Sequence, residues 1–143
     1  MQTMSAIRVP SSQQARVLVV DDIPENRILL CRYFGVRGFM MVQADSGTAA
    51  LTMIQRQNFD AVLLDILMPG MDGIEVLKRI RAIHPPSTLP VIMVSAKSAR
   101  MDISLAMDLG ANDYITKPID LAAALVRLRG HLAPKRAAHA LAH

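Results

Sequence analysis

The stretch AVLLDILMPGMDG, residues 61–73, places an aspartate directly between two apolar runs. An ionised carboxylate incurs a desolvation cost among apolar neighbours, so Asp65 must either lie where the chain surfaces or have a compensating partner. The run before it, 61–64, is short, apolar and continuous, which is typical of a strand covered on both faces. Because Pro69-Gly70 then turns the chain, the pattern indicates that Asp65 stands at the end of a buried strand.

Similar apolar runs recur along the chain and alternate with stretches of helical spacing. The other predicted strands are 16–20, 40–44, 90–94 and 113–116, and the predicted helices are 24–37, 46–57, 73–83, 98–109 and 119–132. Short buried strands that alternate with helices in this way favour right-handed crossovers between parallel strands. We therefore predict an α/β fold with a five-stranded parallel sheet and helices on both faces.

The predicted helix over 73–83 shows the helical pattern most clearly. One face carries Ile74, Leu77 and Ile80, and the other carries the charged residues Glu75, Lys78, Arg79 and Arg81. Asp72-Gly73-Ile74-Glu75 has the form of a capping box at its start. Gly110 is a similar signal for the end of the helix over 98–109.

The chain of 143 residues has the size of one domain, and its composition is globular, with 52% hydrophobic and 20% charged residues. Since aromatic residues are only 3%, we expect a core of Val, Ile, Leu, Ala and the 10 Met residues. The polar residues 1–15 are interpreted as a flexible arm and 16–132 as the domain. The Ala-rich residues 133–143 are interpreted as a tail, either a frayed helix or a linker.

The composition disfavours several function classes. The net charge of +4 lies largely late in the chain and few aromatics could stack on bases, so no direct nucleic-acid binding is expected. The apolar runs are too short to cross a membrane, and the first residues lack the apolar block of a secretory signal. The single Cys31, interpreted as a small buried hydrophobe, agrees with a reducing compartment. We therefore expect a cytoplasmic protein without membrane contact.

Chemically active side chains follow four of the predicted strands. Asp21 and Asp22 follow the first, Asp65 the third, Ser95 the fourth and Lys117 the fifth. In open α/β sheets the ends of parallel strands meet at the edge where ligands bind. Singly, each residue has an ordinary structural interpretation: Asp22 could cap the first helix, Ser95 could lie in a turn and Lys117 could be a solvated charge. Jointly, three carboxylates repel one another without a cation, which favours a hard divalent metal such as Mg²⁺.

The same residues supply the groups that phosphoryl transfer needs. Asp65 is the natural nucleophile, and Asp22 and Asp65 would ligate the metal. Asp21 would bind the metal directly or through water. Lys117 would neutralise one phosphoryl oxygen, and Ser95 would donate a hydrogen bond to another.

Four motifs resemble the receiver domain of bacterial two-component response regulators, over about residues 16–132. They are VLVVDD at 17–22, LLDILMPGMDG at 63–73, VIMVSAK at 91–97 and DYITKPI at 113–119. The resemblance implies the flavodoxin-like, doubly wound fold of that family. It also implies that an aspartate accepts a phosphoryl group from a phosphohistidine on a sensor histidine kinase or a histidine phosphotransfer protein. Such a receiver catalyses only its own phosphorylation and dephosphorylation.

Carried over by motif, the resemblance assigns a phosphoacceptor, an acidic pair for Mg²⁺, a switch hydroxyl and a phosphate-contacting lysine; these are Asp65, Asp21 with Asp22, Ser95 and Lys117. It further implies a metal ligand in the backbone carbonyl of Leu67 and a cis peptide between Lys117 and Pro118. Tyr114 matches the aromatic residue that moves inward with the switch hydroxyl. A half-buried Tyr on a short strand is an equally good interpretation of Tyr114.

The resemblance also places an output face over about 98–130. Phosphorylation would shift the population of this face toward one arrangement. That arrangement would bind a downstream protein or a fused output domain, or would pair two copies as a homodimer. Because Leu67 offers no group to orient an attacking water and Lys97 is basic, we expect slow self-dephosphorylation.

Other function classes stay open on the sequence. A haloacid-dehalogenase-type phosphatase also places an aspartate, a hydroxyl and a lysine around Mg²⁺, but it needs a second acid where Leu67 stands. A flavodoxin-like nucleotide or flavin binder would need a Gly- or Ser/Thr-rich loop where DDIPEN stands at 21–26. A degenerate receiver that only docks partners would lack a key residue. His139 and His143 lie four apart in the tail and could share a helix face for a metal.

Overall fold

The computed structural model describes the backbone of residues 14–142 and the side chains of residues 14–134. One parallel sheet has the strand order β2-β1-β3-β4-β5, with β1 (Arg16–Val20), β2 (Met40–Ala44), β3 (Ala61–Asp65), β4 (Val91–Ser95) and β5 (Asp113–Thr116). The helices are α2 (Pro24–Gly35), α3 (Gly47–Arg56), α4 (Gly73–Arg81), α5 (Arg100–Asp108) and α6 (Leu121–Ala142). The predicted α/β fold with a five-stranded parallel sheet is confirmed.

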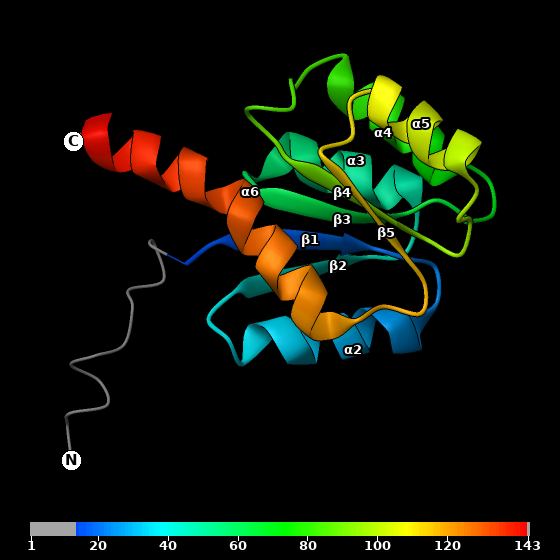
Figure 1. Cartoon of the computed structure of the whole chain (residues 1–143), viewed down its shortest axis with the longest axis horizontal. Coiled ribbons are helices and arrows are strands. Elements are labelled where there is room, and N and C mark those ends of the chain that lie inside the picture. Colours follow the sequence, from blue (N-terminus) through cyan, green and yellow to red (C-terminus); the bar gives the residue numbers. More distant parts are fainter. Residues whose placement is uncertain (1–13, 143) are drawn as a thin grey trace.

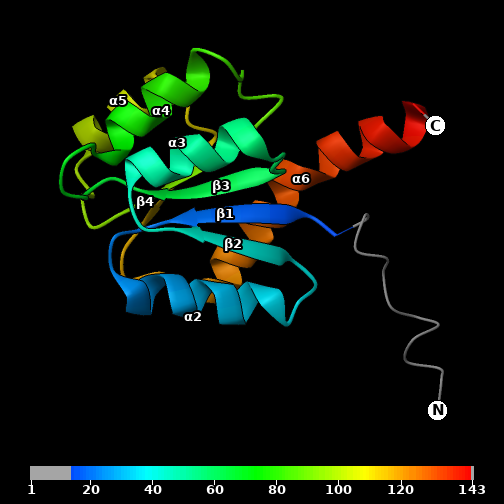
Figure 2. The same ribbon diagram turned by 180° about the vertical axis from the view of Figure 1, so that it is seen from behind.

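The helices form two layers, one on each face of the sheet. α2 and α6 cover one face, and α3, α4 and α5 cover the other (Figures 1 and 2). Alternate residues of β1 enter the two cores: Leu18 and Val20 pack on the α3–α5 side, and Val17 and Val19 on the α2–α6 side. All five residues of β3 are buried, as its continuous apolar run predicts.

The observed helices differ from the predicted ones mainly at their ends. Most are a few residues shorter, whereas α6 continues to Ala142, through the residues interpreted as a tail. Its last turns extend past the amino edge of the sheet (Figure 1). The division into arm, domain and tail stays a prediction. Residues 1–13 of the arm and the side chains of His139 and His143 lie outside the described residues.

Two helix boundaries follow the predicted local chemistry. The Asp72 carboxylate accepts a hydrogen bond of 2.9 Å from the backbone N–H of Glu75 at the start of α4. α5 ends at Asp108, and Gly110 follows with a φ of 104°, a conformation that favours glycine. The Asp72 cap and the Gly110 stop are confirmed, whereas the Glu75 carboxylate, the other half of a capping box, accepts from Arg79 Nε at 3.0 Å.

Methionine contributes less to the core than expected. Among the methionines whose side chains are described, only Met68 and Met93 are buried. Met101 and Met107 are exposed on α5. The core is therefore built mainly from aliphatic side chains, with Phe34, Phe59 and Tyr114 as its aromatic members.

Arg81 lies on the charged face of α4, yet its guanidinium is bound to backbone and side-chain oxygens of neighbouring segments. Its Nε donates to Gly110 O at 2.7 Å, its Nη1 to His84 O at 3.0 Å and Leu89 O at 2.9 Å, and its Nη2 to Asn112 Oδ1 at 2.8 Å. Burial lowers the pKa of Arg81 to about 10, so the guanidinium stays charged at neutral pH. Arg81 thereby ties the end of α4 to the segments that precede β4 and β5.

Among the described residues, no helix is both long enough and apolar enough to cross a membrane.

Candidate functional site

The carboxyl ends of β1 and β3 bring three aspartates together. The two strands are neighbours, and Val20 pairs with Leu64, so Asp21 and Asp65 lie side by side at the edge of the sheet. Asp21, Asp22 and Asp65 each offer a carboxylate oxygen, and these oxygens lie within 4.8 Å of one another. Asp21 and Asp65 are only 3% and 4% exposed, so their mutual repulsion is poorly screened by water.

Lys117 brings a cation to this cluster from the end of β5. Its Nζ lies 3.4 Å from Asp21 Oδ2 and 3.5 Å from Asp65 Oδ2. Its backbone N–H donates to Ser95 O at 2.8 Å, and the peptide bond to Pro118 is cis, as expected. The lysine stem therefore starts beside β4, and the ammonium reaches both carboxylates at the ends of β1 and β3.

Burial dominates the acidity of Asp65. Desolvation raises its pKa above the ordinary value, the Lys117 charge opposes this rise and the Asp21 charge adds to it. Hydrogen bonds from the Leu67 backbone N–H and from Lys117 also favour the ionised form. The protein thus holds a carboxylate in a place where ionisation is costly, which is a common property of reactive groups.

The two adjacent acids have different surroundings. Asp21 Oδ1 accepts from the Ile23 N–H at 2.9 Å, and Oδ2 accepts from Asn26 Nδ2 at 3.2 Å and from Lys117. Asp22 Oδ1 is buried and has no hydrogen-bond partner among the described residues. The interpretation of Asp22 as a helix cap is wrong, because Ile23 is the N-cap residue of α2 and no side chain caps that helix.

The donor set fits a hard divalent cation. Three carboxylates supply oxygen ligands of the kind that Mg²⁺ prefers. The unpartnered oxygen of Asp22 is a costly feature in a structure without a cation, and a bound cation would remove that cost. The backbone carbonyl of Leu67, expected as a further ligand, belongs to the loop directly after Asp65, and the Leu67 side chain is half-exposed.

Ser95 and Tyr114 hold the loop after β4. The Ser95 hydroxyl is buried and accepts from the Lys97 N–H at 3.1 Å. The Tyr114 hydroxyl donates to the Lys97 carbonyl at 2.7 Å. Burial raises the pKa of Tyr114, and a hydrogen bond with Ser95 partly offsets this rise. The backbone N–H and the backbone carbonyl of Lys97 are thus bound by Ser95 and Tyr114, the two residues predicted to act as a switch.

Sequence reasoning missed two residues that support the site. Asn26 and Arg27, in the first turn of α2, both turn back to Asp21: Asn26 binds its carboxylate, and Arg27 Nη1 donates to its carbonyl at 2.8 Å. Arg27 Nε also donates to Gln43 Oε1 at 3.0 Å. The one sequence signal for these contacts is the position of Asn26 and Arg27, five and six residues after Asp21. A helix that begins just after a strand places the residues of its first turn near the end of that strand.

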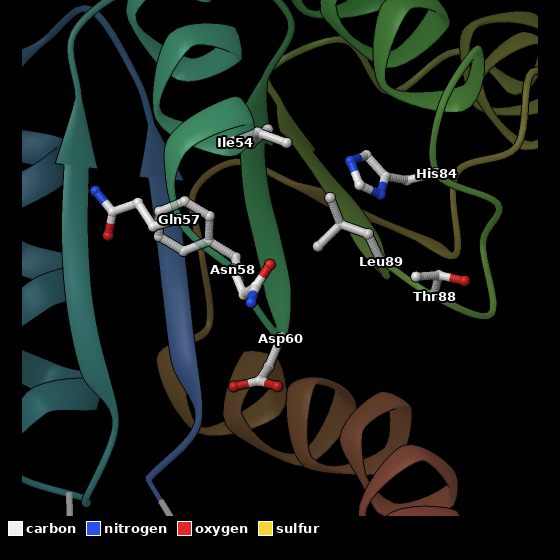
Figure 3. A pocket seen from close by; sticks show the side chains of 8 residues that line it. Ile54, Gln57, Asn58, Asp60, His84, Thr88 and Leu89 are labelled. Atoms are coloured by element: carbon white, nitrogen blue, oxygen red, sulfur yellow. The ribbon is translucent and has the colours of Figure 1, made fainter. Parts of the chain in front are cut away.

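A pocket at the opposite edge of the sheet is separate from this site. Figure 3 shows it between the end of α3 and the segments that precede β3 and β4, lined by Ile54, Gln57, Asn58, Phe59, Asp60, His84, Thr88 and Leu89. Asp60 directly precedes β3, whereas Asp65 ends that strand. The pocket is therefore at the amino edge, a strand's length from the carboxylates, and takes no part in their chemistry.

Comparison with known proteins agrees with this geometry. A family model described as the response regulator receiver domain matches residues 17–129. The chain belongs to this family. It is thus the receiver domain of a two-component response regulator, a signalling protein, and a phosphatase of the haloacid-dehalogenase type is not favoured.

The receiver has relatives of known sequence and structure. It is 36% identical over 121 residues to the DNA-binding response regulator MtrA of Mycolicibacterium smegmatis, covering 85% of this chain and 52% of that protein. It is 34% identical over 126 residues to the probable transcriptional regulatory protein TcrX of Mycobacterium tuberculosis, covering 88% and 53%. The receiver therefore spans about half the length of these curated relatives.

Its fold matches that of solved receiver domains. The receiver domain of Francisella response regulator 1452 superposes with a TM-score of 0.80 at 30% identity, covering 85% of this chain and 99% of that one. The flavodoxin-like, doubly wound architecture implied by the motifs is confirmed.

Replacement of Asp65 by asparagine should stabilise the metal-free receiver at neutral pH, by about 1 kcal/mol in the free energy of unfolding. The pKa of Asp65 is raised in the folded state above its ordinary 3.8, so the folded protein binds this proton more tightly than the unfolded chain does. The ionised group therefore opposes folding above the folded-state pKa, and this penalty disappears as the pH falls toward 3.8. The gain from Asp65→Asn should shrink accordingly in acid.

Urea denaturation with a chelator, at neutral pH and near pH 4, measures this difference. Asp108→Asn, at an exposed position on α5, is the control and should change stability by less than about 0.5 kcal/mol at either pH. An Asp65→Asn receiver no more stable than the wild type at neutral pH would contradict the expectation.

Proposed function

We propose that Asp65 accepts a phosphoryl group from a phosphohistidine of a sensor histidine kinase or a histidine phosphotransfer protein, with Mg²⁺ as cofactor. The observation that carries the proposal is the convergence of Asp21, Asp22 and Asp65 with the Lys117 ammonium, which lies 3.4 and 3.5 Å from two of these carboxylates. These residues supply a nucleophile, oxygen ligands for a metal and a cation for developing charge.

The transfer forms a bond between an Asp65 carboxylate oxygen and phosphorus, and it breaks the bond between phosphorus and the imidazole nitrogen of the donor. The electron pair of that bond returns to the imidazole. When bound, Mg²⁺ would neutralise phosphoryl oxygens, and Asp22, Asp65 and the Leu67 carbonyl would hold it, with Asp21 as a further ligand directly or through water. Lys117 would contact a phosphoryl oxygen through the ammonium that now pairs with Asp65. The receiver would catalyse only this transfer and the later hydrolysis.

The phosphorylated site would act on the output face, residues 98–130, through Ser95 and Tyr114. A phosphoryl oxygen would accept a hydrogen bond from the Ser95 hydroxyl, which now accepts one from the Lys97 N–H. The loop that Tyr114 holds through the Lys97 carbonyl would then settle in a second arrangement. A partner that binds one of the two arrangements more tightly would shift the population toward that arrangement.

The output of this face would be a protein contact. The relatives MtrA and TcrX are named as a DNA-binding and a transcriptional regulator, and this chain matches only about half of each. We therefore assign the output face to a downstream protein, a fused output domain or a second copy in a homodimer, and not to nucleic acid directly. A cytoplasmic location without membrane contact agrees with a kinase partner of this kind.

Treatment with acetyl phosphate and Mg²⁺, followed by intact-mass measurement, tests the proposal. The wild-type receiver should gain the mass of one phosphoryl group, and Asp65→Asn should gain none. Equal labelling of the two proteins, or no labelling of the wild type, would refute the role of Asp65. Continuous release of inorganic phosphate with many turnovers would indicate a phosphatase instead.

The phosphorylated receiver should lose its phosphoryl group slowly, with a lifetime far longer than seconds. The half-exposed side chain of Leu67, two residues after Asp65, has no polar group to orient a water, and Lys97 is exposed. Leu67→Asn introduces an amide at this position and should shorten the lifetime by about tenfold. Loss of the added mass with time, after removal of acetyl phosphate, gives both lifetimes. A wild-type lifetime of seconds would show that the apolar side chain does not protect the phosphoryl group.

A further inference from the structure

Asn26 contacts the acidic cluster, and the proposed phosphoryl transfer gives it no role. We propose that Asn26 is a positioning residue of the Mg²⁺ site: its side-chain amide holds the Asp21 carboxylate, so that the Lys117 ammonium is shared with Asp65 instead of being drawn to Asp21. This inference rests on the proposed function, because it concerns the same cation and the same carboxylates.

The first turn of α2 anchors Asp21 at two points. Asn26 Nδ2 donates to Asp21 Oδ2 at 3.2 Å, and Arg27 Nη1 donates to Asp21 O at 2.8 Å. The backbone of this turn is itself closed, since the Asn26 N–H donates to Ile23 O at 3.1 Å. Both the side chain and the main chain of Asp21 are thus fixed by the helix that begins directly after it.

This anchoring gives the two adjacent acids different tasks. Asp21 already accepts hydrogen bonds on both oxygens, from Ile23, Asn26 and Lys117. Asp22 keeps one buried oxygen without a partner among the described residues. A carboxylate whose oxygens are engaged holds its orientation, whereas an open oxygen is free to ligate a cation. Asn26 therefore serves the cation through Asp21, and Asp22 serves it directly.

The charge of the donor explains why an amide suits this position. The amide of Asn26 is neutral, so it supports Asp21 without cancelling the negative charge that attracts Mg²⁺. Lys117 is nearly equidistant from Asp21 and Asp65, at 3.4 and 3.5 Å. Without the amide, the buried Asp21 Oδ2 would have Lys117 as its one remaining donor among the contacts described. The ammonium would then pair more closely with Asp21 and compete with Mg²⁺ for that carboxylate.

Titration of the whole chain with Mg²⁺ alone, followed by calorimetry, tests the proposal without any phosphodonor. Asn26→Leu keeps the size of the side chain and removes the amide; it should weaken Mg²⁺ binding by about tenfold. Asn26→Gln keeps the amide on a longer arm and should recover part of this loss. Asn58→Leu removes an exposed asparagine at the amino edge of the sheet and should bind Mg²⁺ like the wild type.

Phosphorylation by acetyl phosphate at increasing Mg²⁺ supplies the second measurement. The Asn26→Leu receiver should need about tenfold more Mg²⁺ to reach half its maximal rate, and the maximal rate itself should change little. If Asn26→Leu fails to fold, Asn26→Ser takes its place. The same loss of Mg²⁺ affinity is expected, because the serine side chain is too short for its hydroxyl to replace the amide at Asp21 Oδ2.

The outcomes separate the inference from the function on which it rests. Wild-type Mg²⁺ affinity in a folded Asn26→Leu or Asn26→Ser receiver overturns the positioning role. An equal loss of affinity in the Asn58→Leu control also overturns it, since the effect would then be general. A failure of the proposed function would appear in the wild-type chain itself, which would take up neither Mg²⁺ nor a phosphoryl group.

Discussion

Lys117→Met should slow the phosphorylation of Asp65 by about two orders of magnitude, and excess Mg²⁺ should not restore the rate. The Lys117 ammonium lies 3.5 Å from Asp65 Oδ2 and is only 24% exposed, so its charge acts in a poorly solvated site. Its removal takes away the cation that would stabilise charge developing on the phosphoryl group. Methionine keeps most of the apolar stem, so the loss reports the charge rather than the packing.

The rate of mass increase with acetyl phosphate, measured across a range of Mg²⁺ concentrations, checks this prediction. Lys78→Met, which removes an exposed cation from α4, is the matched control and should leave the rate unchanged. A Lys117→Met rate within about threefold of the wild type would show that Lys117 does not act on the phosphoryl group. Recovery of the Lys117→Met rate at high Mg²⁺ would assign Lys117 to the metal site alone, because that is the behaviour expected of Asn26→Leu.

Gly73→Ala should destabilise the receiver by at least about 3 kcal/mol, because the added methyl group has no room. A Cβ at Gly73 would overlap the carbonyl oxygen of Asp65 and would lie 2.7 Å from the Cα of Ile66. These are backbone atoms at the end of β3, and the Gly73 N–H already donates to Ile66 O at 2.9 Å. Relief of the overlap requires α4 to move away from the strand that carries Asp65.

Gly70→Ala is the matched control for this change. Gly70 lies in the same loop with a φ of 74°, and a Cβ there would meet open space. Its replacement should cost about 1 kcal/mol from the left-handed backbone alone. Urea denaturation of the two variants gives the comparison. Equal stability of Gly73→Ala and Gly70→Ala would contradict the close approach of α4 to β3.

The strands and the acidic cluster were predictable because their signals are local or follow from topology. β3 is buried along its whole length, and a fully covered strand leaves a continuous apolar run in the sequence. Once the strands are parallel, Asp21, Asp65 and Lys117 must follow strand ends at one edge. The contact of Lys117 with both carboxylates was predictable because Lys117 has a long side chain and follows a nearby strand.

The polar contacts that support the site could not be predicted, because the partners come from separate segments. Arg81 belongs to a charged helical face in the sequence, yet its four acceptors lie between His84 and Asn112. Asn26 resembles any polar residue in a first helical turn, and its role depends on the orientation of the Asp21 side chain. The unpartnered oxygen of Asp22 likewise depends on Ile23, rather than Asp22, being the N-cap residue of α2.

The contacts of Arg81 hold one end of α5 in place. The Arg81 guanidinium binds Gly110 and Asn112, which join α5 to β5 at the edge of the sheet remote from Asp65. The other end of α5 follows the loop at Lys97, whose backbone N–H and carbonyl bind Ser95 and Tyr114. Under the proposed function, a displacement of Ser95 would move the start of α5 while Arg81 holds its other end, and the exposed surface of the helix would tilt.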